Sequence, residues 1–144
     1  MRKIWTLAGI VATTAAIVAS TGAAPATAAP AAAAALATSS AAPTKASNVK
    51  TRTYSYRSGL GTLQMRYGKY NNKTWIWARI EKPTKLANDK YEITVAAQGT
   101  YLHKNISGTS YTTALEAKDG VRYKVCIAKI DAQLCTGPEL AWVY

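Results

Sequence analysis

The strongest constraint on the fold is a two-residue alternation of apolar and polar side chains that recurs along residues 49–144. Successive side chains of a strand point to opposite faces, so such a run has one apolar and one polar face. This pattern is typical of half-buried antiparallel strands. The apolar positions of three such runs are Leu63, Met65 and Tyr67; Tyr91, Ile93, Val95 and Ala97; and Val121, Tyr123, Val125 and Ile127.

Turn-forming residues separate these runs, namely Ser58-Gly59, Asn71-Asn72, Asn88-Asp89, Ser107-Gly108 and Asp119-Gly120. Between two of the turns, the segment 112–118 has residues that also suit a helical turn, but we expect a strand that leads into a turn. About seven short strands in a region of this length indicate a β-sandwich or a small barrel. The sequence therefore predicts an all-β fold, a small antiparallel β-sandwich.

The N-terminal part has the composition of an export leader. Met1-Arg2-Lys3 is basic, an apolar stretch runs over residues 4–18, and Ala26-Thr27-Ala28 suits signal peptidase. We expect residues 1–28 to be a signal peptide and the protein to be secreted; the alternative is an uncleaved membrane anchor. Residues 29–48 are almost entirely Ala, Pro, Ser and Thr, and we expect a disordered linker, serving as a tether or trimmed after export.

Both cysteines, Cys126 and Cys135, lie near the end of the predicted domain of residues 49–144. In an oxidising compartment they are expected to form a disulfide. Their spacing suits a hairpin that pairs Ile127 with Leu134 and turns at residues 129–132. A redox or metal role is the alternative, but two cysteines and the chain's single histidine are too few for a closed zinc site. We predict no metal and no cofactor.

The second half of the domain resembles the E-to-F region of fibronectin type III domains. The matching residues are Ser110-Tyr111-Thr112-Thr113-Ala114-Leu115, the turn Asp119-Gly120, and Tyr123-Lys124-Val125-Cys126-Ile127-Ala128. The earlier order Trp75-Ile76-Trp77, Pro83, Tyr91-Glu92-Ile93 is also similar. The resemblance implies an immunoglobulin/fibronectin III-like sandwich over about residues 75–134. It also implies that Tyr123 lies at a corner, its hydroxyl bonded to upstream backbone, whereas the alternative is an ordinary core tyrosine.

One predicted strand, residues 73–81, has a chemically suggestive face. Lys73, Trp75, Trp77 and Arg79 alternate with apolar residues and so share one side of the strand. Two indoles between cations suit a stacking platform for sugar rings, with the cations holding acidic groups. The alternative is that a tryptophan belongs to the sandwich core.

The chain is strongly basic, with 18 Lys and Arg against 7 Asp and Glu and a net charge of +11. Six of the cations cluster in sequence around the tryptophan strand: Lys69, Lys73, Arg79, Lys82, Lys85 and Lys90. Such a surface suits an anionic polysaccharide, a cell-wall polymer or lipid headgroups. Nucleic acid is not expected, since no nucleic-acid-binding motif is present. A solvated face that maintains solubility is the alternative.

Enzymatic activity is not predicted. His103 is the chain's single histidine, and the sequence holds no nucleophile elbow, zincin motif or phosphate-binding glycine loop. A glycosidase would need two carboxyl groups facing each other across a cleft. We expect a non-catalytic binding or adhesion module for anionic or glycan surfaces. The alternative is a secreted inhibitor or effector that acts on an extracellular protein through an exposed loop at residues 98–110.

Overall fold

The computed structural model describes residues 34–55, 59–130, 132, 135 and 139–144. The predicted signal peptide, residues 1–28, and the first part of the predicted linker lie outside the described residues. None of the helical structure within the described ranges is long and apolar enough to cross a membrane.

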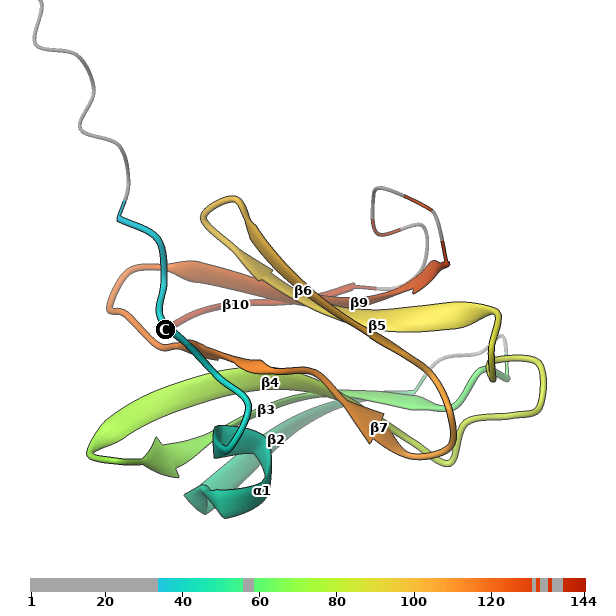
Figure 1. Cartoon of the computed structure of the whole chain (residues 1–144), viewed down its shortest axis with the longest axis horizontal. Helices are drawn as coiled ribbons and strands as arrows, with labels where there is room; N and C mark the ends of the chain where they lie inside the picture. The colour runs from blue at the N-terminus through green and yellow to red at the C-terminus, as the bar shows by residue number, and fades with distance from the viewer. Residues whose placement is uncertain (1–33, 56–58, 131, 133–134, 136–138) are drawn as a thin grey trace, which may run out of the picture. The chain divides into compact units, whose positions relative to one another are not determined.

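The described residues form two antiparallel sheets that lie face to face (Figure 1). The first sheet has the strand order β1-β8-β4-β3-β2, with β7 also paired to β4. Its strands are β1 (Thr38–Ser39), β2 (Ser47–Ser55), β3 (Thr62–Tyr70), β4 (Lys73–Glu81), β7 (Ser110–Tyr111) and β8 (Ala114–Glu116). The second sheet has the order β10-β9-β5-β6, built from β5 (Tyr91–Ala97), β6 (Thr100–Asn105), β9 (Arg122–Lys129) and β10 (Glu139–Val143). The predicted all-β sandwich is confirmed, with ten described strands instead of about seven.

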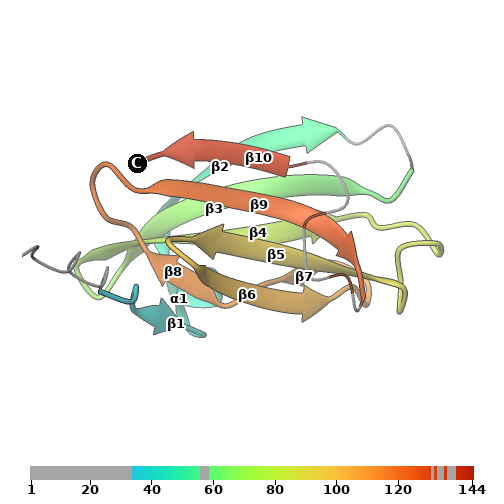
Figure 2. The ribbon, with the colours of Figure 1, turned by 90° about the horizontal axis from the view of Figure 1, so that it is seen from above.

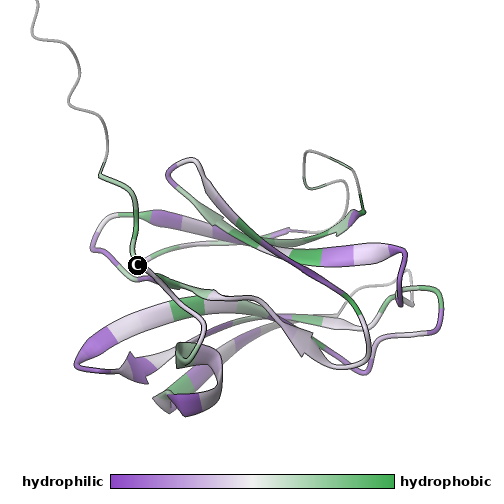
Figure 3. Ribbon diagram, in the orientation of Figure 1, coloured by the Kyte–Doolittle hydropathy of each residue, from purple (hydrophilic) through white to green (hydrophobic). Residues whose placement is uncertain are grey.

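The core lies between the two sheets and uses the side chains that the alternation predicted. Figure 3 shows apolar and polar segments alternating along the strands. The first sheet contributes Leu63, Met65, Ile76, Ala78, Ile80 and Leu115, and the second Ile93, Val95, Ala97, Tyr123, Val125 and Ile127. Burial of these apolar side chains makes the largest favourable contribution to the free energy that holds the two layers together.

Two hairpins close through residues with positive φ. Asn71 and Asn72 join β3 to β4 with φ values of 50° and 58°, as expected for a tight turn whose twist matches the strands. Gln98 and Gly99 join β5 to β6 in the same way, with φ values of 46° and 77°. The exposed loop predicted over residues 98–110 is therefore wrong for about half of its length, because residues 100–105 form β6.

The segment predicted to be ambiguous, residues 112–118, contains strand β8, as expected. A break at Thr112 and Thr113 separates β8 from β7, although both pair with β4. Thr112 covers this break: its backbone N–H donates to the carbonyl of Ala78, and its hydroxyl accepts from the Ala78 N–H at 3.1 Å. Its side chain thus replaces a backbone group of the ladder.

The predicted linker, residues 29–48, is wrong over its later part. Residues 38–48 form β1, the short helix α1 (Ala42–Lys45) and the start of β2. β1 pairs with β8, and the Glu116 N–H donates to the carbonyl of Ala37 at 2.9 Å. Leu36 joins the main core and Ala42 is completely buried. The small alanine side chains that suggested a featureless linker instead allow the chain to lie close against a sheet.

The disulfide between Cys126 and Cys135 is present, with the two Cα atoms 5.7 Å apart. The hairpin predicted around it has the wrong register. The Ala132 N–H does donate to the Lys129 carbonyl at 3.0 Å, as in the predicted turn, but the strand that pairs with β9 is β10, in which Glu139 lies opposite Cys126. The disulfide therefore closes the connection between β9 and β10 instead of joining two opposed strand residues. Leu134, the expected partner of Ile127, lies outside the described residues.

Candidate binding site

The predicted tryptophan platform is not exposed. Trp75 and Trp77 do lie on the outer face of the first sheet, but their exposed fractions are only 6% and 1%. They form a second, small core with Ala42 of α1 and Ala114 of β8. The Trp75 indole N–H donates to the backbone carbonyl of Tyr70 at 2.9 Å. The segment that was expected to be a linker covers the rings, so the prediction of an aromatic surface at these positions is wrong.

The cations of that face are held by neighbouring carboxylates. The Lys73 ammonium lies 3.1 Å from the Glu116 carboxylate, and the Lys118 ammonium lies 3.2 Å from the same oxygen. The hydrogen bond from Lys73, supported by Lys118, lowers the pKa of Glu116 below its ordinary value, although burial opposes this effect. Arg79 pairs with Glu81 at 3.4 Å. Of the four predicted ligand-binding residues, the two cations are thus paired with carboxylates and the two indole rings are buried, so neither ring is available to a sugar.

The predicted lysine cluster divides between two ends of the sandwich. Lys69 and Lys73 lie near the β3–β4 turn, where Tyr70 pairs with Lys73. Lys82, Lys85 and Lys90 follow the opposite end of β4, about 27 Å away at the usual rise of a strand. These side chains are exposed but do not make one continuous patch.

A different aromatic cluster lies where the edge strands β2 and β10 approach each other, on the same side of the two layers (Figure 2). Trp142 of β10 is 4.7 Å from the ring of Tyr67 in β3, measured between ring centroids. Tyr144 packs against Trp142 edge to face at 5.3 Å. All three rings are partly exposed, so they combine apolar faces with access to solvent.

Cations surround this aromatic cluster. The guanidinium carbon of Arg52 lies 5.1 Å from the centre of the Trp142 ring, a cation–π contact. Lys50 and Lys69 line the adjacent groove, which has a volume of about 600 Å³. Among the described residues that line it, none is acidic: Asn48, Val49, Lys50, Tyr67, Gly68, Lys69, Thr74 and Tyr144. We call this surface the edge groove.

The edge groove has a rigid floor and rim. β2 bulges between Ser47 and Lys50 and approaches Gly68 closely, since a Cβ atom at Gly68 would lie 3.0 Å from the Ser47 carbonyl oxygen. Only glycine fits this approach without movement of β2. On the other side, the Tyr144 hydroxyl lies 3.1 Å from the Thr74 hydroxyl and connects the two sheets. The Tyr144 ring is therefore held both by this hydrogen bond and by its packing against Trp142.

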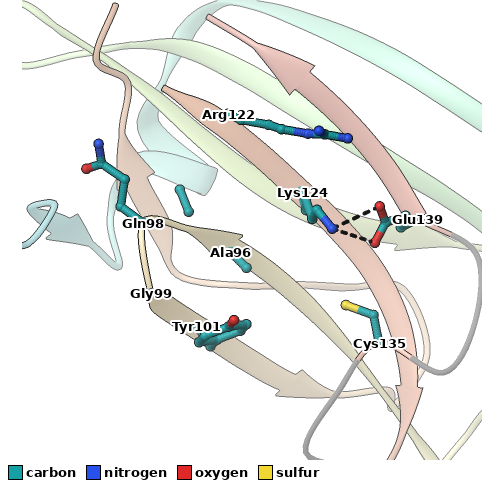
Figure 4. A pocket seen from close by; sticks show the side chains of 9 residues that line it. Ala96, Gln98, Gly99, Tyr101, Arg122, Lys124, Cys135 and Glu139 are labelled. Carbon is teal, nitrogen blue, oxygen red and sulfur yellow. Dashed lines mark hydrogen bonds and ion pairs between the residues drawn. The ribbon is translucent and has the colours of Figure 1, made fainter. Parts of the chain in front are cut away.

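A second hollow lies on the outer face of the other sheet, as Figure 4 shows. Tyr101, whose exposed fraction is 52%, borders it from β6, and the disulfide residue Cys135 borders it from the opposite side. The Lys124 ammonium crosses the hollow to Glu139 at 3.1 Å. Arg122 remains beside this pair. A carboxylate thus already neutralises the central cation, which makes the hollow less suited to anions than the edge groove.

The single histidine lies beside that hollow in a local hydrogen-bond network. His103 Nδ1 is 3.0 Å from the Glu92 carboxylate and 2.9 Å from the Thr94 hydroxyl. Both contacts use the same ring nitrogen, so Glu92 does not orient His103 toward Thr94 as the orienting acid of a catalytic triad does. Over the described residues, no group of three or more His, Cys, Asp or Glu side chains could hold a metal ion.

Apart from Lys69, which belongs to the predicted cation cluster, the sequence analysis did not assign the residues of the edge groove to a site, although one signal pointed to them. Glu81 is the first acidic residue of the whole chain, so every charged residue of β2 and β3 is a cation. That asymmetry indicates a basic sheet edge. The position of Trp142 against Tyr67 was not predictable, because the two residues lie in different sheets and far apart in sequence.

Comparison of the chain with models of protein families, with curated proteins and with solved structures finds no match.

Proposed function

We propose that this protein is a secreted, non-catalytic binding module that takes an acidic polysaccharide in the edge groove. The observation that carries the proposal is the placement of Arg52 over the Trp142 ring beside Tyr67 and Tyr144. Aromatic faces suit the apolar faces of sugar rings, and nearby cations suit their carboxylates. A groove of this volume holds a few sugar units.

The charges of the groove favour an anionic ligand over a neutral one. Lys50 and Lys69 have no carboxylate partner within the described part of the chain, in contrast to Lys73, Lys118 and Lys124. A bound uronic acid would supply the missing opposite charge. The cationic side chains on edge strand β2 also oppose pairing with a strand of another chain, and this second role is compatible with the first.

Export and the family resemblance form part of the same proposal. A disulfide suits an oxidising compartment outside the cytosol, which supports secretion.

The family resemblance can be tested by giving the strands the letters of the immunoglobulin-like fold. With β4 and β5 taken as strands B and C, β8, β9 and β10 become E, F and G. B and E then share one sheet, and C, F and G share the other, as in immunoglobulin-like sandwiches. The hydrogen bonds of Tyr123 support the same assignment, and the additional strand β2 departs from it.

Titration with polygalacturonate and with uncharged dextran tests the proposed ligand. We expect binding to polygalacturonate that weakens as salt rises from low to physiological concentration, and no binding to dextran. The double variant Lys50→Ala/Lys69→Ala is expected to bind about tenfold more weakly, since two solvent-exposed ion pairs together contribute about 1.4 kcal/mol.

The matched control is Lys82→Ala/Lys85→Ala, which removes the same charge from an exposed segment at the far end of β4. This variant is expected to retain most of the affinity. An equal loss in both variants would mean that only net charge matters, and the edge groove would be excluded as the site. Absence of binding to any acidic polymer at low salt would overturn the proposed function.

A further inference from the structure

Two arginines lie close together on the outer face of the first sheet, away from the edge groove. In the β3–β4 ladder, Arg66 pairs with Trp77, and Gln64 pairs with Arg79. Paired residues share a face, and Trp77 lies on the outer one. Arg66 and Arg79 are therefore diagonal neighbours on that face, within reach of each other through their long side chains.

Arg79 has one neighbouring partner for each of its two terminal nitrogens, which leaves its other N–H donors available. One of its terminal nitrogens donates to the Gln64 side-chain oxygen at 3.2 Å, and the other pairs with the Glu81 carboxylate at 3.4 Å. The Gln64 amide in turn donates to the second oxygen of Glu81 at 2.9 Å. The single carboxylate of this group is thus already bound on both oxygens.

Arg66 lacks comparable partners. Its Nε–H is buried and has no hydrogen-bond partner among the described residues. Burial, and secondly the charge of Arg79, lower the pKa of Arg66, while Glu81 opposes the shift only as the smallest contribution. A buried charged donor without a partner is costly in free energy, and native proteins seldom leave one unexplained.

We propose that Arg66 and Arg79 form a binding site for a tetrahedral oxyanion, the phosphate or sulfate group of a larger ligand. A guanidinium presents paired donors in a plane that match two oxygens of such a group. Thr51 pairs with Arg66 across the β2–β3 ladder and is exposed, so its hydroxyl is available on the same face. The buried Trp77 on the other side of Arg66 lowers the local polarity and strengthens the interaction.

This site is independent of the proposed polysaccharide function. The two surfaces lie on opposite faces of β3, because Arg66 and Tyr67 are consecutive in the strand. Their ligands also differ in chemistry, since the edge groove is proposed to take carboxylates on sugar rings. Each proposal can therefore fail without the other.

NMR observation of the arginine Nε–H groups of the full protein tests the site with inorganic ions as probes. The protein is titrated with sodium phosphate and with sodium sulfate, against sodium chloride at matched ionic strength. We expect a saturable shift of the Arg66 signal, which is assigned by its loss in Arg66→Lys. That variant is expected to bind phosphate about tenfold more weakly in a calorimetric titration, because an ammonium cannot present the paired donors. Arg122→Lys, at an exposed position on the other sheet, is the matched control and is expected to bind phosphate normally.

The outcomes separate the two ion sources and the two proposals. A shift with both phosphate and sulfate supports the site and means that it takes tetrahedral oxyanions in general. A shift with only one of the two ions supports the site and identifies that ion's group as the ligand. An Arg66 signal that responds to chloride as it does to phosphate, or to none of the salts, would overturn the site. Loss of phosphate binding in Lys50→Ala/Lys69→Ala would also overturn it, because those side chains lie on the other surface.

Discussion

The hydroxyl of Tyr123 donates a hydrogen bond to the backbone carbonyl of Glu116, 2.8 Å away and seven residues earlier in the chain. The same oxygen accepts from the backbone N–H of Lys118 at 2.9 Å. Tyr123 lies near the start of β9 and Glu116 ends β8, so one buried side chain fixes the connection between the two sheets. The hydrogen bond expected of Tyr123 from the sequence is therefore present.

Removing this hydroxyl is expected to destabilise the fold. In Tyr123→Phe the Glu116 carbonyl and the Lys118 N–H lose their shared partner, which should lower the free energy of unfolding by about 1–3 kcal/mol. Urea denaturation measures this change. Tyr101→Phe, at an exposed tyrosine, is the control and should leave stability unchanged. Equal stability of the two variants would mean that the corner does not hold the sheets.

Because of Tyr123, the stability of the fold is also expected to depend on pH in the alkaline range. Burial raises the pKa of Tyr123 above its ordinary value of 10.0. A raised folded pKa contributes stability that is complete below the unfolded value and is lost as pH rises through the folded one. Stability should therefore fall above pH 10, and this decrease should be smaller in Tyr123→Phe than in the wild type.

Enlarging Ala42 should displace the segment that covers the tryptophans. Ala42 is completely buried against Trp75 and Trp77, so Ala42→Leu would overpack this small core and is expected to cost about 1–3 kcal/mol. Acrylamide quenching of tryptophan fluorescence should increase in this variant. Ala35→Leu, at an exposed alanine of the same segment, is expected to change neither property. Unchanged quenching in Ala42→Leu would contradict the docked position of α1.

Glu116 predicts a dependence of stability on acid. Hydrogen bonds from Lys73 and Lys118 lower its pKa below the ordinary 4.5. A lowered folded pKa gives stability that is present above pH 4.5 and lost as pH falls through the folded value. Glu116→Gln is therefore expected to lose stability at neutral pH but to show a weaker decrease in acid, as measured by thermal unfolding. Asp119→Asn, at an exposed carboxyl, should follow the wild type. If Glu116→Gln lost stability in acid as steeply as the wild type, another carboxylate would be the main source of the acid dependence.

The sequence alone determined the class of fold, several turns and the disulfide. Strand alternation depends only on which face each side chain takes, and turn residues depend on local φ, so both follow from short stretches of chain. The runs at 63–67, 91–97 and 121–127 accordingly lie in β3, β5 and β9, apart from Val121, which directly precedes its strand. With only two cysteines, the pairing had a single solution.

Only the tertiary structure decided which side of each strand is covered, and by what. The face bearing Trp75 and Trp77 alternates in the same way whether it meets water or α1, and alanines between prolines carry no periodicity that would indicate docking. The edge groove is likewise made of residues from different sheets. Arg52 contacts Trp142 although the two residues lie near opposite ends of the domain's sequence. Such contacts depend on how the two layers are stacked, which is a property of the whole packed domain and not of any segment.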